Sequence, residues 1–109
     1  MLVEDEPLIA MVAGEILRDL GYIVFEARTK GEALAVLAVE DGVSLLFTDV
    51  QLADGSSGIE LAHEIAGGCP DMRIVVTSGR ILSAVLPDGA KFVPKPYSAD
   101  QLAAAFETH

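Results

Sequence analysis

The sequence has little of several features that mark particular classes of protein. It has one cysteine, which excludes an internal disulfide and favours a reducing, cytoplasmic compartment. It has no signal-peptide pattern and no apolar run near the roughly 20 residues that span a bilayer. Basic residues are few, seven against 17 acidic ones, and the formal net charge is −10. A surface this negative repels nucleic acid and anionic membranes, so neither is expected as a direct partner.

The sequence does have enough apolar material for a core. Its 109 residues fit one domain, residues 1–109, and 51% of them are hydrophobic. Such a chain can bury a core without metal or disulfide support. The acidic excess suits a solvated surface, so a protein partner is expected to offer a basic or apolar face.

Segments typical of strands and helices alternate along the chain. Apolar or β-branched runs predict strands at residues 2–3, 22–25, 44–49, 72–77 and 90–94. Three helices are predicted to begin with capping boxes, at Thr29, Ser57 and Ser98. Residues 81–86 are predicted to form one or two further turns of helix. The first helix is predicted between Pro7 and Gly21 from an apolar repeat at helical spacing, formed by Ile9, Val12, Ile16 and Leu20.

This alternation predicts an α/β fold, a doubly wound five-stranded parallel sheet with helices on both faces. Right-handed crossovers bring the carboxyl ends of all strands to one edge, where ligands of such folds bind. A single polar residue after a strand is more often a turn or surface residue. Here, however, several polar residues end four strands and are predicted to meet in one pocket, namely Glu4, Asp5, Asp49, Ser78 and Lys95.

Three carboxylates in one pocket repel one another and call for a cation. Oxygen ligands without His or Cys indicate a hard ion, Mg²⁺ before zinc. Mg²⁺ keeps open positions that phosphate oxygens fill, and an aspartate can itself attack phosphorus to give an aspartyl phosphate. A lysine and a hydroxyl would neutralise the phosphoryl oxygens. The pocket is therefore suited to a phosphoryl group.

Across nearly its whole length the chain resembles the receiver domain of two-component response regulators. Four segments in order carry the resemblance: Val3-Glu4-Asp5-Glu6-Pro7, Phe47-Thr48-Asp49-Val50, Val76-Thr77-Ser78-Gly79 and Phe92-Val93-Pro94-Lys95-Pro96. The resemblance implies a flavodoxin-like sheet of order 2-1-3-4-5. It also implies that the domain is not an enzyme but a phosphoacceptor, charged by a sensor histidine kinase or a histidine phosphotransfer protein in the presence of Mg²⁺.

The resemblance also implies roles for the residues at the metal and the acceptor. Asp49 would accept the phosphoryl group and bind Mg²⁺. Asp5 would bind the metal directly, Glu4 through water, and Gln51 through its backbone carbonyl. Lys95 would pair with the phosphoryl oxygens, across a cis bond to the proline after it.

For the response to phosphorylation, the resemblance implies a two-state switch. Ser78 would be the hydroxyl that turns toward the phosphoryl group, and Phe92 would hold the aromatic switch position. Gln51 and Arg80 match the variable positions that tune the loss of the phosphoryl group.

The sequence departs from the family pattern in four places. Leu52-Ala53 stands where many members have Met-Pro, which predicts a looser loop after Asp49. Only 11 residues, 81 to 91, separate Arg80 from Phe92, so the fourth helix is expected to be short or remodelled. The usual output and dimer surface, which this helix helps to form, is expected to differ as well. The sequence thus neither predicts nor excludes a homodimer. Phe92 lacks a tyrosine hydroxyl, and with three residues before the acid pair the first strand is expected to be clipped.

Three other functions compete with a phosphorylated switch. A receiver-like docking module that never uses its acceptor would share the fold, and it stays open as the alternative. A flavodoxin-like electron carrier needs a phosphate-binding loop after the first strand, where Glu4-Asp5-Glu6 would repel the phosphate. An aspartate phosphatase usually carries a second aspartate two residues after the nucleophile, and here that residue is Gln51.

Overall fold

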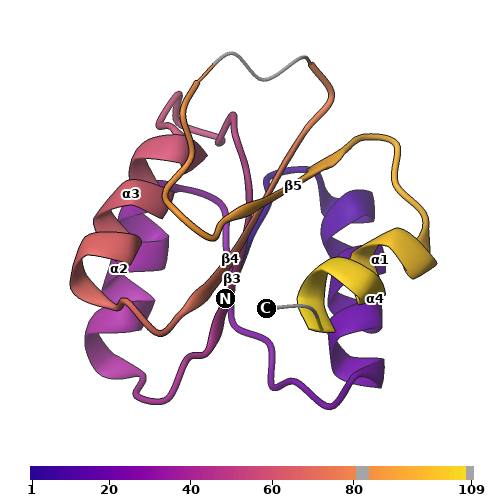
Figure 1. The fold of residues 1–109 in the computed structure, drawn as a ribbon, viewed down its shortest axis with the longest axis horizontal. Helices are drawn as coiled ribbons and strands as arrows, with labels where there is room; N and C mark the ends of the chain where they lie inside the picture. Colours follow the sequence, from indigo (N-terminus) through magenta and orange to yellow (C-terminus); the bar gives the residue numbers. More distant parts are fainter. Residues whose placement is uncertain (81–83, 108–109) are drawn as a thin grey trace.

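The computed structural model describes residues 1–80 and 84–107, which form one five-stranded sheet flanked by helices (Figure 1). The strands run in the order β2-β1-β3-β4-β5, and all four pairings are parallel, as predicted. The strands are β1 (Leu2–Val3), β2 (Glu26–Ala27), β3 (Leu45–Asp49), β4 (Arg73–Ser78) and β5 (Lys91–Pro94). The helices are α1 (Pro7–Asp19), α2 (Lys30–Val39), α3 (Gly58–Gly68) and α4 (Ala99–Glu107).

Two helices cover each face of the sheet. Helices α2 and α3 lie on one side, the α2/α3 face, and α1 and α4 lie on the other, the α1/α4 face (Figure 1). Side chains of β3 and β4 alternate between the faces, because successive strand residues point in opposite directions. Leu46 and Val76 therefore belong to the core of the α2/α3 face, whereas Phe47 and Val75 belong to that of the α1/α4 face.

The predicted helix starts are confirmed by their caps. Thr29 accepts a hydrogen bond from the backbone N–H of Glu32, and Ser57 accepts from Glu60 at the start of α3. Before α4, Ser98 and Gln101 exchange side-chain to backbone bonds of 3.1 and 2.8 Å, a complete capping box. No helix among the described residues has the length and apolar character needed to cross a membrane.

Helix α1 buries a different stripe from the one its large apolar residues suggest. Its fully buried residues are small ones and one leucine, namely Ala10, Ala13, Gly14 and Leu17. Val12 is instead 50% exposed, and Leu8 and Met11 are 72% and 53% exposed. Small side chains let the helix lie close to the sheet. Ile16 and Leu20 pack at the margin of the core, as predicted, whereas Leu8, Met11 and Val12 remain on the outer side of the helix.

The second strand lies later in the chain than predicted. The predicted strand 22–25 is wrong, since β2 comprises Glu26 and Ala27. Strand β1 is only two residues long and pairs with those two positions, so residues 22–24 have no strand beside them there. β propensity alone did not place the strand, because a strand needs a hydrogen-bonding neighbour.

The connection between β4 and β5 shows no helix where it is described. The prediction for 81–86 falls partly on 81–83, which lie outside the described residues. Residues 84–90 are irregular and include a turn in which Ala90 donates its backbone N–H to the Pro87 carbonyl. On this segment, the carbonyl of Val85 lies 2.7 Å from Nε2 of His63 on α3.

Candidate functional site

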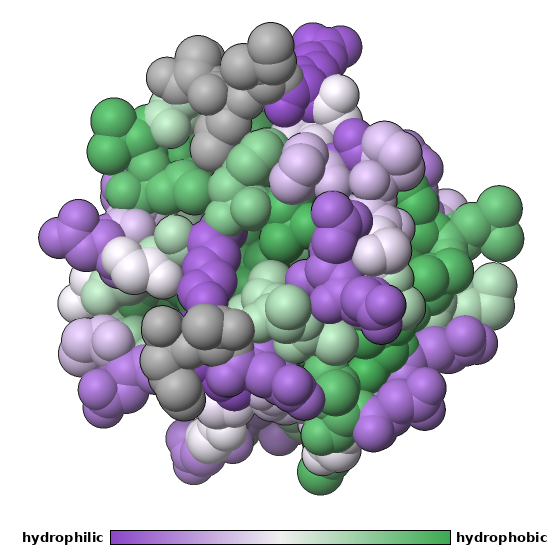
Figure 2. Space-filling model, turned by 45° about the vertical axis from the view of Figure 1, so that its right-hand side comes forward, coloured by the Kyte–Doolittle hydropathy of each residue, from purple (hydrophilic) through white to green (hydrophobic). Residues whose placement is uncertain are grey.

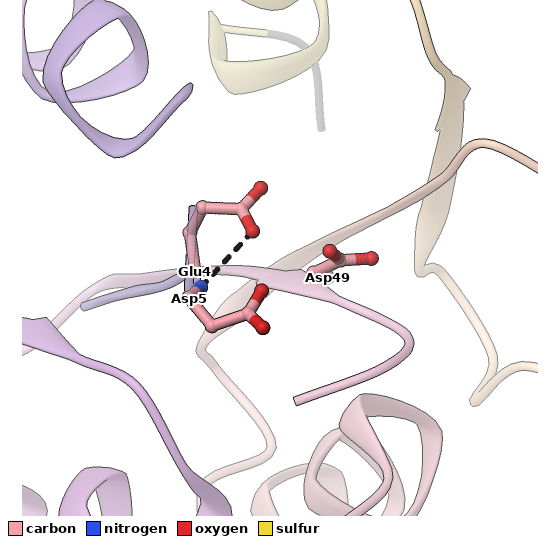
Figure 3. Close-up of side chains that lie close together, drawn as sticks. All are labelled: Glu4, Asp5 and Asp49. Carbon is pink, nitrogen blue, oxygen red and sulfur yellow. Dashed lines mark hydrogen bonds between the residues drawn. The ribbon is translucent and has the colours of Figure 1, made fainter. Parts of the chain in front are cut away.

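The carboxyl ends of β1 and β3 bring three acidic side chains together. Glu4 and Asp5 follow β1, and Asp49 is the last residue of β3. One carboxylate oxygen from each lies within 4.8 Å of the others, and Figure 3 shows the Asp5 and Asp49 side chains extending into the same space. The sequence predicted this cluster, because parallel strands end at one edge.

Glu4 is a buried carboxylate, 4% exposed, and hydrogen bonds hold its side chain in place. Its Oε2 accepts the backbone N–H of Asp5 at 3.0 Å, the bond drawn in Figure 3, and that of Glu6 at 3.4 Å. Burial raises the pKa of Glu4 from 4.5 to about 7; the hydrogen bond from Lys95 opposes this rise, and the charge of Asp49 adds to it. A nearby cation would thus stabilise the charged form of Glu4.

Lys95 supplies the positive charge of the cluster. Its Nζ donates to Asp49 Oδ2 at 2.9 Å and to Glu4 Oε1 at 3.0 Å, and its side chain is 16% exposed. Burial acts to lower the pKa of Lys95, but the hydrogen bonds to the two carboxylates outweigh it and the pKa is raised. One ammonium facing three carboxylates leaves a negative excess that a divalent cation would neutralise. The peptide bond between Lys95 and Pro96 is cis, as predicted.

Ser78 and Phe92 lie on the α2/α3 side of the sheet, the face opposite that of the Asp49 side chain. Ser78 ends β4, is 9% exposed and accepts the backbone N–H of Arg80 at 3.1 Å. Phe92 pairs with Val76 and packs against the core of the α2/α3 face. Arg80 and Gln51 are exposed. Their tuning roles, and the role of the Gln51 carbonyl as a metal ligand, stay predictions.

The loop after Asp49 is anchored to the rest of the domain, and whether it is looser than in members with Met-Pro stays a prediction. Leu52 is 5% exposed, and Ala53 donates its backbone N–H to the carbonyl of Arg28. At the end of the loop, a Cβ added to Gly58 would lie 1.8 Å from the backbone oxygen of Asp49. Only glycine allows α3 to approach the acceptor so closely. Sequence reasoning missed this contact, although a glycine directly after the capping Ser57 was a signal for it.

Sequence reasoning also missed two buried hydroxyls on the α1/α4 face. Thr77 Oγ1 and Tyr97 Oη have no hydrogen-bond partner among the described residues. Thr77 is 1% exposed on β4, and the Tyr97 ring packs edge-on against Phe47. Burial, followed by the charge of Glu4, raises the pKa of Tyr97 to about 12. The one available signal was a threonine within the otherwise apolar run 74–77.

An apolar groove of about 530 Å³ opens next to Lys95. The exposed apolar residues of α1 form one wall, and the segment around the cis bond forms the other; the lining comprises Leu8, Ile9, Val12, Gly79, Lys95, Pro96 and Tyr97. In Figure 2, apolar surface is exposed between hydrophilic side chains in the view turned toward the α1 and α4 side.

Known proteins that resemble the chain are signalling proteins. It is 32% identical over 107 residues to the phyllosphere-induced regulator PhyR of Methylorubrum extorquens, and 36% identical over 109 residues to the sensor kinase CckA of Brucella abortus. These alignments cover 95% and 94% of the chain but only 40% and 11% of those proteins. The chain therefore spans well under half of either relative.

A solved structure and a family model agree with these relatives. The crystal structure of a response regulator from Burkholderia pseudomallei, with a phosphorylated aspartic acid, calcium ion and citrate, superposes with a TM-score of 0.83 at 28% identity. The match covers 98% of this chain and 65% of that one. The model of the response regulator receiver domain matches residues 1–107. The chain therefore belongs to the response regulator receiver domain family.

Proposed function

We propose that the domain accepts a phosphoryl group on Asp49 from a phosphohistidine and responds by changing a protein-binding surface. The observation that carries this proposal is the arrangement at Asp49. Its carboxylate shares a pocket with two further acids and lies 2.9 Å from the Lys95 ammonium. Receiver domains are signalling domains, and the similar Burkholderia protein contains a phosphorylated aspartic acid and a calcium ion.

The acid cluster fits Mg²⁺ by its donor chemistry. Asp5 and Asp49 would hold the ion directly, Glu4 through water, and the Gln51 carbonyl would complete the protein ligands. Bound there, the ion neutralises charge on the phosphoryl oxygens. The carboxylate then forms its bond to phosphorus while the bond between phosphorus and the imidazole nitrogen breaks, and that electron pair returns to the imidazole.

Lys95 is positioned to stabilise the transferred group. Its Nζ already lies between Glu4 and Asp49, so a short movement would bring it to the phosphoryl oxygens. The response would act on the α2/α3 side of the sheet, where Phe92 packs and where the hydroxyl of Ser78 accepts the backbone N–H of Arg80. Two surface states of similar energy make such a switch.

The partner that supplies the phosphoryl group would dock on the apolar groove beside Lys95. The groove lies next to the acceptor and is walled by Leu8 and Val12, which are 72% and 50% exposed. An amphipathic helix that carries the phosphohistidine would cover these residues. Such a helix fits a sensor histidine kinase or a histidine phosphotransfer protein, which carry their histidine in the cytoplasm, where ATP is available.

Incubation with acetyl phosphate tests the acceptor role. We expect a single phosphoryl adduct by intact mass that requires Mg²⁺ and is absent from Asp49→Asn. The matched control is Asp88→Asn, which alters an exposed carboxylate and is expected to keep the adduct. A folded wild-type protein without the adduct would contradict the proposal and favour a docking module that works without phosphorylation.

A further inference from the structure

Helix α2 is apolar on its outer side as well as on the side that faces the core. From residue 33 to residue 39 it contains only alanine, leucine and valine. Ala33 is buried, and Val36 and Leu37 pack against the core of the α2/α3 face. The remaining residues of this run adjoin one another on the helix and are exposed, namely Leu34, Ala35, Ala38 and Val39. The outer side of α2 thus presents an uncharged, apolar strip to solvent.

The neighbouring helix α3 shows the ordinary pattern of a surface helix. Its apolar residues Leu61 and Ile65 are buried, whereas His63 and Glu64 are exposed. A helix that is apolar all round is normally buried on all sides. On α2, however, Val39 is 76% exposed. The outer side of α2 therefore has the composition of a covered surface, and clustered exposed apolar residues mark sites of protein contact.

A hollow of about 410 Å³ opens beyond the carboxyl end of α2, at the amino edge of the sheet. Ile23, which is 83% exposed, and Val24 are among its apolar lining residues. Glu40 and Asp41 line it as well, and both are exposed. Neither carboxylate has an ion pair within the described part of the chain. A side chain with an apolar stem and a cationic end would fill this hollow, and arginine has both.

We propose that the outer side of α2 and the hollow, together the α2 surface, bind a basic amphipathic helix of a partner protein. The α2 surface comprises the lining of the hollow and the exposed residues Leu34, Ala35, Ala38 and Val39. The apolar stripe of the partner helix would lie along α2, where the two alanines allow close approach. An arginine beside the stripe would place its stem on Ile23 and its guanidinium at Glu40 or Asp41. A second copy of the chain is the poorer occupant, because each copy has a net charge of −10 and like charges would meet.

The α2 surface is separate from the acceptor site. The groove beside Lys95 is walled by α1, which lies on the opposite face of the sheet from α2 (Figure 1). The hollow lies at the amino edge of the sheet, whereas Asp49 lies at the carboxyl edge. A partner on α2 would therefore leave the groove free for the phosphoryl donor, and its binding would not require phosphorylation of Asp49. The domain would thus join two proteins.

A synthetic peptide tests the proposal with the whole, unphosphorylated chain. The peptide forms a helix of about four turns, with leucine and alanine on one face and arginine on both flanks. By fluorescence anisotropy at physiological ionic strength we expect it to bind, and we expect a matched peptide with glutamate for arginine not to bind. Val39→Lys should weaken binding about tenfold, because it removes apolar contact and adds a like charge. Met11→Lys, the same kind of change at an exposed apolar residue of α1, should leave binding within about twofold.

An acid of the hollow gives the second readout. Glu40→Gln should weaken binding about threefold and reduce its salt dependence, whereas Glu15→Gln, which removes an exposed acid of α1, should change neither. Equal losses in the paired variants would show that the peptide binds the acidic surface at large, and would overturn the proposal. No binding to the folded wild type would overturn it too. So would a wild-type dimer in sedimentation that Val39→Lys converts to a monomer, because a second copy would then cover α2.

Discussion

The two faces of the sheet meet at the acceptor but carry different groups. On the α1/α4 face, Asp49 and Thr77 stand side by side next to Glu4. On the α2/α3 side are Ser78, whose hydroxyl is bonded to the Arg80 backbone, and Phe92 in the core. Because strand residues alternate between faces, Thr77 and Ser78 differ by one position and serve opposite sides. The proposed phosphoryl chemistry and the proposed response to it would therefore lie on opposite faces of the sheet.

The largest effect is expected from a substitution on the α2/α3 face that pushes α3 against the backbone of Asp49. Gly58→Ala would place a Cβ 1.8 Å from the Asp49 oxygen and 2.8 Å from Thr48 Oγ1. We expect a loss of about 3 kcal/mol in the free energy of unfolding, because α3 must move away from β3. Urea denaturation measures it, and adduct formation should fall as well.

The matched control for this change lies on the same helix. Gly67→Ala meets nothing within 4 Å. It should leave the protein as stable as wild type or slightly more so, since alanine is the better helix former. Equal stability of the Gly58 and Gly67 variants would show that α3 does not constrain the acceptor.

A smaller effect is expected from the charge of Glu4. Its pKa is raised from 4.5 to about 7, so between these pH values the folded state holds a proton that the unfolded state has lost. The contribution of Glu4 to the free energy of unfolding should therefore fall as the pH rises through this window, by about 2 kcal/mol, and the difference between wild type and Glu4→Gln should show this fall. Urea denaturation at pH 5 and pH 8 with EDTA measures it. Glu6→Gln, at an exposed neighbour, should keep the wild-type slope.

The smallest effect concerns the second unpaired hydroxyl. Tyr97→Phe removes a buried hydroxyl without a partner, so the melting temperature should stay level or rise slightly. Tyr22→Phe removes a hydroxyl that accepts a bond from Arg73, and should cost about 1 kcal/mol. Thermal unfolding compares the two. A Tyr97 variant that lost as much as the Tyr22 variant would mean that the Tyr97 hydroxyl is bonded in the resting state.

The sequence was sufficient for the topology and for the acid-lysine cluster. Asp49 ends one strand and Lys95 follows another, both recognisable from apolar runs, and the topology of parallel strands brings their ends together. The place of β2 was not predictable in this way, since it depends on the length of its partner β1. Likewise, the buried stripe of α1 was set by the close approach of small residues to the sheet, which hydrophobicity does not report.

Contacts between elements were the other part that the sequence did not supply. The glycine after Ser57 was a signal of a close approach, but only packing shows that the neighbour of Gly58 is the Asp49 backbone. The free hydroxyl of Thr77 became visible only once its neighbours were known. Both features depend on distances of a few ångströms between segments far apart in sequence.

The position of Lys95 has a consequence for the order in which the domain becomes competent. Its two carboxylate partners lie 46 and 91 residues earlier in the chain. A chain emerging from the ribosome therefore presents the acids long before the lysine that neutralises them, and contacts of such long range form late in folding. Readiness to receive a signal thus coincides with completion of nearly the whole fold, and an unfinished domain cannot report one.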